Sequence, residues 1–135
     1  MALLICNLIF IWGNSMLPGE ISGAISDWVK NVIAMLFSGD GNISSGGGLI
    51  RKIAHFTEFA ALGGLFAWLF GMLKKKRYWP LICGVTAACV DETIQRFVPD
   101  RGPSIRDVGI DSCGVLLGMT LLYLGHIYCK KKQTN

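Results

Sequence analysis

Three long stretches of the sequence contain no Asp, Glu, Lys or Arg, and they constrain the fold more than any other feature. They cover residues 59–73, 78–90 and 112–129. With their flanking residues, each approaches the roughly 20 residues that an α-helix needs to cross a bilayer. Residues 2–17 form a shorter uncharged segment that contains Asn7, Asn14 and Ser15.

These segments predict an all-α polytopic membrane protein that forms a single domain over residues 1–135. We expect four transmembrane helices, at about residues 2–17, 53–73, 78–98 and 105–128. A cleaved signal peptide is the alternative for the first segment, but no basic region precedes it.

The composition excludes the soluble classes of protein. Hydrophobic residues make up 52% of the 135 residues and charged residues 16%, whereas soluble domains carry about 25% charged residues. A soluble domain of this size cannot bury so much apolar surface. This argues against a soluble enzyme, a disordered tail and a nucleic-acid-binding module.

Two basic clusters predict the orientation of the helices. Residues 74–77 lie between the second and third predicted spans, and residues 130–132 follow the fourth. Lys and Arg next to a span favour the cytoplasmic side. With four spans, both clusters fall on that side, so we expect both termini to be cytoplasmic.

In this topology the charges separate by side. The inner clusters carry seven positive charges, and all nine acidic residues lie in the outer portion with six bases, which gives a net charge of −3 there and +4 for the chain. The inner charges orient the helices. The outer charges mark the face where we expect function.

Residues 21–35 predict a further helix. Apolar side chains recur at helical spacing from Ile21 through Ile25 and Trp28 to Met35. The pattern is typical of an amphipathic helix that lies on the outer membrane surface, or of an ordinary helix packed on the spans. The Gly- and Ser-rich residues 38–48 then read as a linker.

The second span begins with polar residues that share one helix face. Arg51, His55 and Glu58 follow one another at spacings of four and three. A single His in a span is often a hydrogen-bonded core residue, but His55 with Glu58 on the same stripe is less easily explained in that way.

The third span ends with two consecutive carboxylates, Asp91 and Glu92. Each costs a few kcal/mol to insert, so both must face a cavity or find partners. Gln95 shares a face with Asp91, and Arg96 shares a face with Glu92. An ion pair between Glu92 and Arg96 near the interface is the alternative interpretation.

The fourth span begins with Asp107 and Asp111, four residues apart, and the same stripe continues through Gly114 and Gly118. Ser104 and Asp107 resemble a capping box, which is an alternative role for Asp107. The glycines form a small-xxx-small pattern that lets another helix approach closely.

These groups predict one polar pocket in the outer third of the bundle. A cluster of carboxylates requires protons, arginines or a divalent cation. His, Glu and Asp can bind a metal, although no HExxH motif is present. The expected lining residues are His55, Glu58, Asp91, Glu92, Gln95, Arg101, Asp107 and Asp111.

The three motifs together resemble the VanZ-like family over about residues 49–119. Phe59 stands where Tyr is common in the family, and Asp111 where members carry Asp or Asn. The residues that carry the resemblance are Arg51, Lys52, His55, Phe56, Glu58, Phe59, Asp91, Glu92, Gln95, Phe97, Val98, Pro99, Arg101, Arg106, Asp107, Val108, Asp111 and Gly114.

The resemblance implies a small bacterial membrane protein, and the namesake of the family is linked to resistance to the glycopeptide teicoplanin. We expect a cell-envelope protein that binds or processes a lipid-linked or cell-wall component, with membrane lipids, a lipid-linked cell-wall precursor or a glycopeptide as partners and no nucleic acid. Candidate catalytic residues are His55, Glu58, Asp91, Glu92 and Asp107, and candidate binding residues are Arg51, Gln95, Arg101 and Asp111.

In such a site His55 or Glu92 would act as the general acid or base, and Arg51 and Arg101 would hold an anionic headgroup. Binding without turnover fits the same residues. Two alternatives stay open at this point: a small oligomeric transporter or proton-coupled channel, because intramembrane acids often mark ion paths, and a structural membrane protein.

Overall fold

The computed structural model describes residues 1–37 and 47–133, and every regular element in this part of the chain is an α-helix. This confirms the predicted all-α class. The linker at residues 38–48 lies almost entirely outside the described residues. The helices are α1 (Ala2–Ser15), α2 (Gly19–Phe37), α3 (Gly47–Met72), α4 (Trp79–Gln95) and α5 (Ile105–Gln133).

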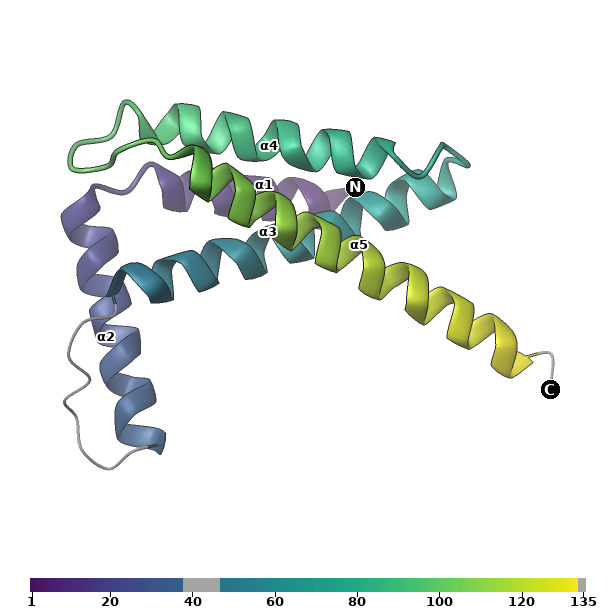
Figure 1. Ribbon diagram of the computed structural model, residues 1–135, viewed down its shortest axis with the longest axis horizontal. Helices are drawn as coiled ribbons and strands as arrows, with labels where there is room; N and C mark the ends of the chain where they lie inside the picture. The colour runs from purple at the N-terminus through teal and green to yellow at the C-terminus, as the bar shows by residue number, and fades with distance from the viewer. Residues whose placement is uncertain (38–46, 134–135) are drawn as a thin grey trace.

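Four helices run along the long axis of the molecule, and α2 lies across one end of it (Figure 1). α3 contacts α1, α4 and α5, and α3 and α5 make the most extensive of the contacts between helices. α2 is bent by 109° away from α1 and packs on α3. One end of the bundle therefore gathers the end of α1, the start of α3, the end of α4 and the start of α5.

Two of the described helices are long and apolar enough to cross a membrane. They cover Gly48–Met72 and Ile105–Lys132, and the bent pair α1–α2 would make a third span if it is counted as one. α1 has 14 residues and α4 has 17, which gives lengths of about 21 and 26 Å. Because a hydrocarbon core is about 30 Å thick, length alone does not make either of them a span.

The helix boundaries differ from the predicted spans. α3 begins at Gly47 rather than near residue 53, because the polar residues 51 and 52 lie within its first turns. α4 ends at Gln95 rather than residue 98, just before Pro99, which disfavours helical geometry in the residue before it. α5 continues to Gln133, past the predicted end at residue 128.

α3 and α5 meet through glycines, as the small-xxx-small pattern predicted. A Cβ atom added to Gly114 would collide with the carbonyl oxygen of Phe56, and one added to Gly118 would collide with that of Ala60. The missing side chains thus allow the two backbones to touch. Val115, between the two glycines, is fully buried.

The turn between α1 and α2 is attached to the loop between α4 and α5. The Gly19 N–H donates to the Pro99 carbonyl oxygen at 3.2 Å. A Cβ atom on Gly19 would collide with the Asp100 backbone, and Asp100 itself has a left-handed φ of 57°. The close contact therefore requires glycine at position 19, and it fixes the end of α1 beside the end of α4.

α2 confirms the helix predicted for residues 21–35, but its polar side faces the protein. Ser22 and Ser26 are buried, whereas Ile21, Ile25 and Trp28 are about half exposed or more. A surface helix in contact with water would instead bury its apolar stripe against the protein. This orientation favours the membrane-surface interpretation, because the exposed stripe then has lipid to contact.

We expect Gly118→Val to destabilise the protein by about 1–3 kcal/mol or more, because a side chain there forces the two helix backbones apart. Gly125→Val is the matched control, since nothing lies within 4 Å of a Cβ atom at position 125 of the same helix. The measurement is the unfolding midpoint of purified protein in detergent. Equal midpoints for the two variants would contradict the close-packed crossing.

Candidate functional site

The polar residues of the three sequence motifs converge at the end of the bundle where α1 and α4 end and α3 and α5 begin. Asp91 lies four residues before the end of α4, and Asp111 six residues after the start of α5. At about 1.5 Å per residue, both lie within 10 Å of the helix ends.

His55 lies at the centre of the site between two carboxylates. Its Nδ1 atom is 3.8 Å from Oε2 of Glu58 and 3.9 Å from Oδ2 of Asp91. His55 is 8% exposed and Asp91 is fully buried. Both distances are too long for hydrogen bonds, and Nδ1 has no hydrogen-bond partner among the described residues.

Amide side chains hold both of these carboxylates in place. The Gln95 Nε2 donates to Oδ2 of Asp91 at 2.7 Å, as their shared helix face predicted. The Asn14 Nδ2 donates to Oε1 of Glu58 at 3.2 Å. Gln95 also donates to the Ser15 hydroxyl at 3.3 Å. Each carboxylate therefore has one oxygen fixed by an amide, and its second oxygen has no such bond in the described structure.

Glu92 does not form the intrahelical pair with Arg96 that was the alternative interpretation. Glu92 is 6% exposed, and its Oε2 accepts a hydrogen bond of 2.7 Å from the Ser104 backbone N–H. Arg96 is exposed. Glu92 thus connects α4 to the start of α5 and fixes the loop between them.

Asp107 pairs with another helix instead of capping its own. Its Oδ1 lies 3.1 Å from the Lys52 ammonium of α3. The pair is partly exposed, and surface ion pairs contribute little stability. Its importance lies in its position, because it closes one side of the site.

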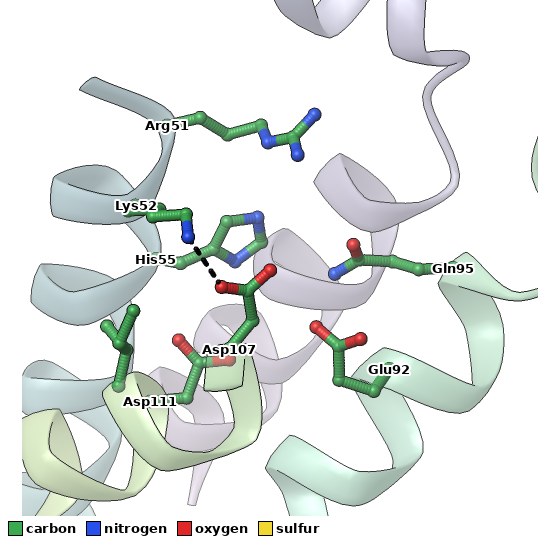
Figure 2. Close-up of a pocket in the computed structure, with 8 residues that line it drawn as sticks. Arg51, Lys52, His55, Glu92, Gln95, Asp107 and Asp111 are labelled. Atoms are coloured by element: carbon green, nitrogen blue, oxygen red, sulfur yellow. Dashed lines mark ion pairs between the residues drawn. The ribbon is translucent and has the colours of Figure 1, made fainter. Parts of the chain in front are cut away.

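A recess opens among these side chains, and seven of its eight lining residues are labelled in Figure 2. Including the open mouth, its empty volume is about 280 Å³, but only about 10 Å³ can hold the centre of a water-sized sphere. The interior thus has room for one water molecule or ion. The lining residues are Arg51, Lys52, His55, Glu92, Gln95, Asp107, Ile110 and Asp111.

Of the nine candidate residues, six line the recess and three lie next to it. Glu58 and Asp91 flank His55 on its buried side. Arg101, in the loop before α5, donates through Nη2 to the Asn14 carbonyl oxygen at 3.3 Å. The structure brings all nine together, and their catalytic or binding roles remain predictions.

Arg101 is an unusual cation for this position because it is 8% exposed. Its Nε and Nη1 atoms have no hydrogen-bond partner within the described residues. Burial lowers the pKa of its guanidinium from the ordinary value, and the neighbouring Arg51 lowers it further, while Asp91 and Glu92 oppose the shift. A guanidinium nevertheless stays protonated, so Arg101 is a buried positive charge with unused donors.

Sequence reasoning missed three contributors to the site. Asn14 and Ser15 come from α1 and contact Glu58 and Gln95, and Lys52 pairs with Asp107. The available signal was the presence of two polar residues at the end of an otherwise apolar segment. Nothing in the sequence alone indicated which motif they would meet.

Three side chains of the site could together hold a metal ion. One donor atom from each lies within 4.8 Å of the others, and all three residues are buried. They are His55, Asp91 and Asp111.

Comparison with family models identifies the family to which the chain belongs. The model of the VanZ/LLP1 family matches residues 1–126. The chain belongs to the VanZ/LLP1 family. The match confirms the resemblance predicted from the motifs and extends it beyond residues 49–119 to include α1 and α2. No curated protein and no solved structure matches the chain.

Membership and the apolar helices together make this a VanZ/LLP1 membrane protein. Phe59, where the resemblance led us to expect a Tyr in many relatives, is fully buried in the apolar core beneath the site. A phenol at this position would need a buried partner. In this chain the floor of the site is purely apolar at that point.

Proposed function

We propose that this VanZ/LLP1 protein binds the anionic headgroup of a lipid-linked cell-envelope component at the outer leaflet of a bacterial cell membrane. The observation that carries the proposal is the buried guanidinium of Arg101, which has two donor nitrogens without a partner among the described residues and lies beside a polar recess. A buried cation of this kind is stabilised by a bound anion, and guanidinium groups recognise phosphate with paired donors.

The shape of the recess supports recognition of a headgroup at its mouth. Its interior is too small for a ligand of ordinary size, since small-molecule pockets typically measure about 300–1,000 Å³. Arg51 and Lys52 lie at the start of α3 on the rim. A lipid phosphate at the mouth would therefore lie on the cationic side of the recess, with Arg51 and Lys52 on the rim and Arg101 next to it.

The apolar core beneath the site argues against the transporter alternative. Phe59, Leu62 and Val115 are all fully buried directly along α3 and α5 from the site. The close contacts of Gly114 and Gly118 with α3 leave no gap between these helices. An ion path needs polar groups or water across the bilayer, and these buried side chains are apolar.

For the membrane arrangement, we propose that α1, α3, α4 and α5 all cross the membrane, with the site external, both termini cytoplasmic and α2 on the outer surface. The basic residues 74–77 and 130–132 lie at helix ends opposite to the site, and clustered bases favour the cytoplasm. The short α1 and α4 can be accommodated by local thinning of the bilayer.

Cysteine labelling tests this arrangement. In a variant without the five native cysteines, we expect Arg106→Cys to react with a membrane-impermeant maleimide on intact bacterial cells, because it lies exposed at the site end. Lys75→Cys, exposed in the opposite loop, should react only after permeabilisation. The reverse pattern would overturn the proposed orientation.

Lipid binding tests the function itself. We expect purified protein in phosphatidylcholine nanodiscs to retain an added polyprenyl phosphate in native mass spectrometry, and Arg101→Gln to reduce the retained fraction at least tenfold, because the buried charge is lost. Arg96→Gln is the matched control, since Arg96 is exposed in the same loop and should bind as the wild type does.

Two results would contradict the proposal. Equal retention by the wild type and Arg101→Gln would show that the guanidinium does not hold the phosphate. Retention of phosphatidylglycerol as strong as that of the polyprenyl phosphate would show recognition of anionic lipid in general and would remove the lipid-linked component from the proposal.

We further propose that this binding contributes to teicoplanin resistance. Expression in a susceptible bacterium should raise the minimum inhibitory concentration at least twofold, and His55→Ala and Glu92→Gln should abolish the increase. Glu92→Gln keeps an oxygen that can accept the Ser104 N–H bond, so its fold should persist. Normal insertion together with an unchanged phenotype in both variants would contradict a functional role for the site.

A further inference from the structure

The spacing of three buried side chains fits a single metal ion. Donor atoms of His55, Asp91 and Asp111 lie within 4.8 Å of one another, and Nδ1 of His55 is 3.9 Å from Oδ2 of Asp91. Metal–ligand bonds of roughly 2.0–2.2 Å place two ligands of one ion about 3–4.4 Å apart. Because the donors lie up to 4.8 Å apart, they would move somewhat closer together on binding a common ion.

The same residues have unused polar atoms that a cation would satisfy. Nδ1 of His55, Oδ1 of Asp91 and Oδ1 of Asp111 are buried without a hydrogen-bond partner among the described residues. These residues are 8%, 0% and 2% exposed, respectively. A buried polar atom without a partner is costly, and three in one cluster from three different helices indicate a shared ligand.

A second layer of hydrogen bonds orients one of these donors, Asp91, and a carboxylate beside His55. Gln95 fixes Oδ2 of Asp91 at 2.7 Å and is itself near Ser15. Asn14 fixes Glu58, whose other oxygen lies 3.8 Å from Nδ1 of His55. Outer partners that hold ligating carboxylates in this way are characteristic of metal sites.

The donor set indicates the class of metal. One imidazole and two carboxylates suit Zn²⁺, Mn²⁺ or Fe²⁺, whereas Mg²⁺ and Ca²⁺ prefer oxygen ligands only. Three protein ligands also leave a coordination position for water or substrate. His55 and Asp111 line the recess, so that position would face its interior, which has room for one water molecule or ion.

We propose that His55, Asp91 and Asp111 bind one divalent transition-metal ion of the zinc class. As a binding site this can be tested by itself. The role that we assign to the metal ion rests on the proposed function. Its open coordination position would receive an oxygen of the anionic headgroup held by Arg101.

The test uses the full chain, purified without a His tag, in nanodiscs after chelation and alkylation of its thiols. We expect one Zn²⁺ per chain by elemental analysis, and Co²⁺ to give the d–d absorption of a nitrogen and oxygen site. Asp111→Asn and His55→Gln should weaken Zn²⁺ binding at least 100-fold. Gln95→Leu, which removes the bond that orients Asp91 together with the bond to Ser15, should weaken it 10- to 100-fold.

The chain supplies matched controls. His126 is the only other histidine and is exposed on α5, and Asp27 is an acid exposed on α2, outside the site. His126→Gln and Asp27→Asn should bind Zn²⁺ as tightly as the wild type. Absence of stoichiometric Zn²⁺, or an equal loss in the controls, would overturn the metal site.

The Arg101→Gln variant separates this inference from the proposed function. It should lose the polyprenyl phosphate but keep its Zn²⁺. A wild type that binds Zn²⁺ but retains no polyprenyl phosphate would leave the metal site standing and refute the proposed function. Retention of the lipid without any Zn²⁺ binding would refute the metal site and leave the proposed function standing.

Discussion

The backbone contact between α3 and α5 determines where the polar groups of this protein meet. Gly114 touches the carbonyl of Phe56, and Gly118 touches that of Ala60. Asp111 lies one turn before Gly114, and His55 immediately precedes Phe56. The same contact that joins the helices therefore sets His55 beside Asp111. Larger side chains at these positions would separate the helices and the polar groups together.

The remaining polar groups are held by partners from every neighbouring element. α1 supplies Asn14 and Ser15, α4 supplies Gln95, and the loop before α5 supplies the Ser104 N–H. In an apolar bundle each carboxylate must be satisfied within the protein. The site is accordingly a network that orders the end of the bundle, with a few donor and acceptor atoms left for a ligand.

Much of this arrangement could be predicted because charge is costly in a membrane. The placement of Asp91 and Glu92 in an apolar segment required a cavity or partners. The structure supplies a hydrogen-bond partner for each, Gln95 for Asp91 and Ser104 for Glu92. The glycine stripe predicted the close helix contact. Helix ends were less predictable, since Arg51 and Lys52 lie inside α3 although their charge suggested a position outside a span.

By itself, the sequence determined the helical class, the membrane setting and the family, because these follow from hydrophobicity and from motif order along the chain. Only the tertiary structure decided that α1 contributes to the site, that α2 turns its serines inward, and that Arg101 is buried. Each of these depends on a contact between segments distant in sequence, such as that of Gly19 with Pro99. Periodicity describes one helix at a time and carries no information about which helix lies opposite.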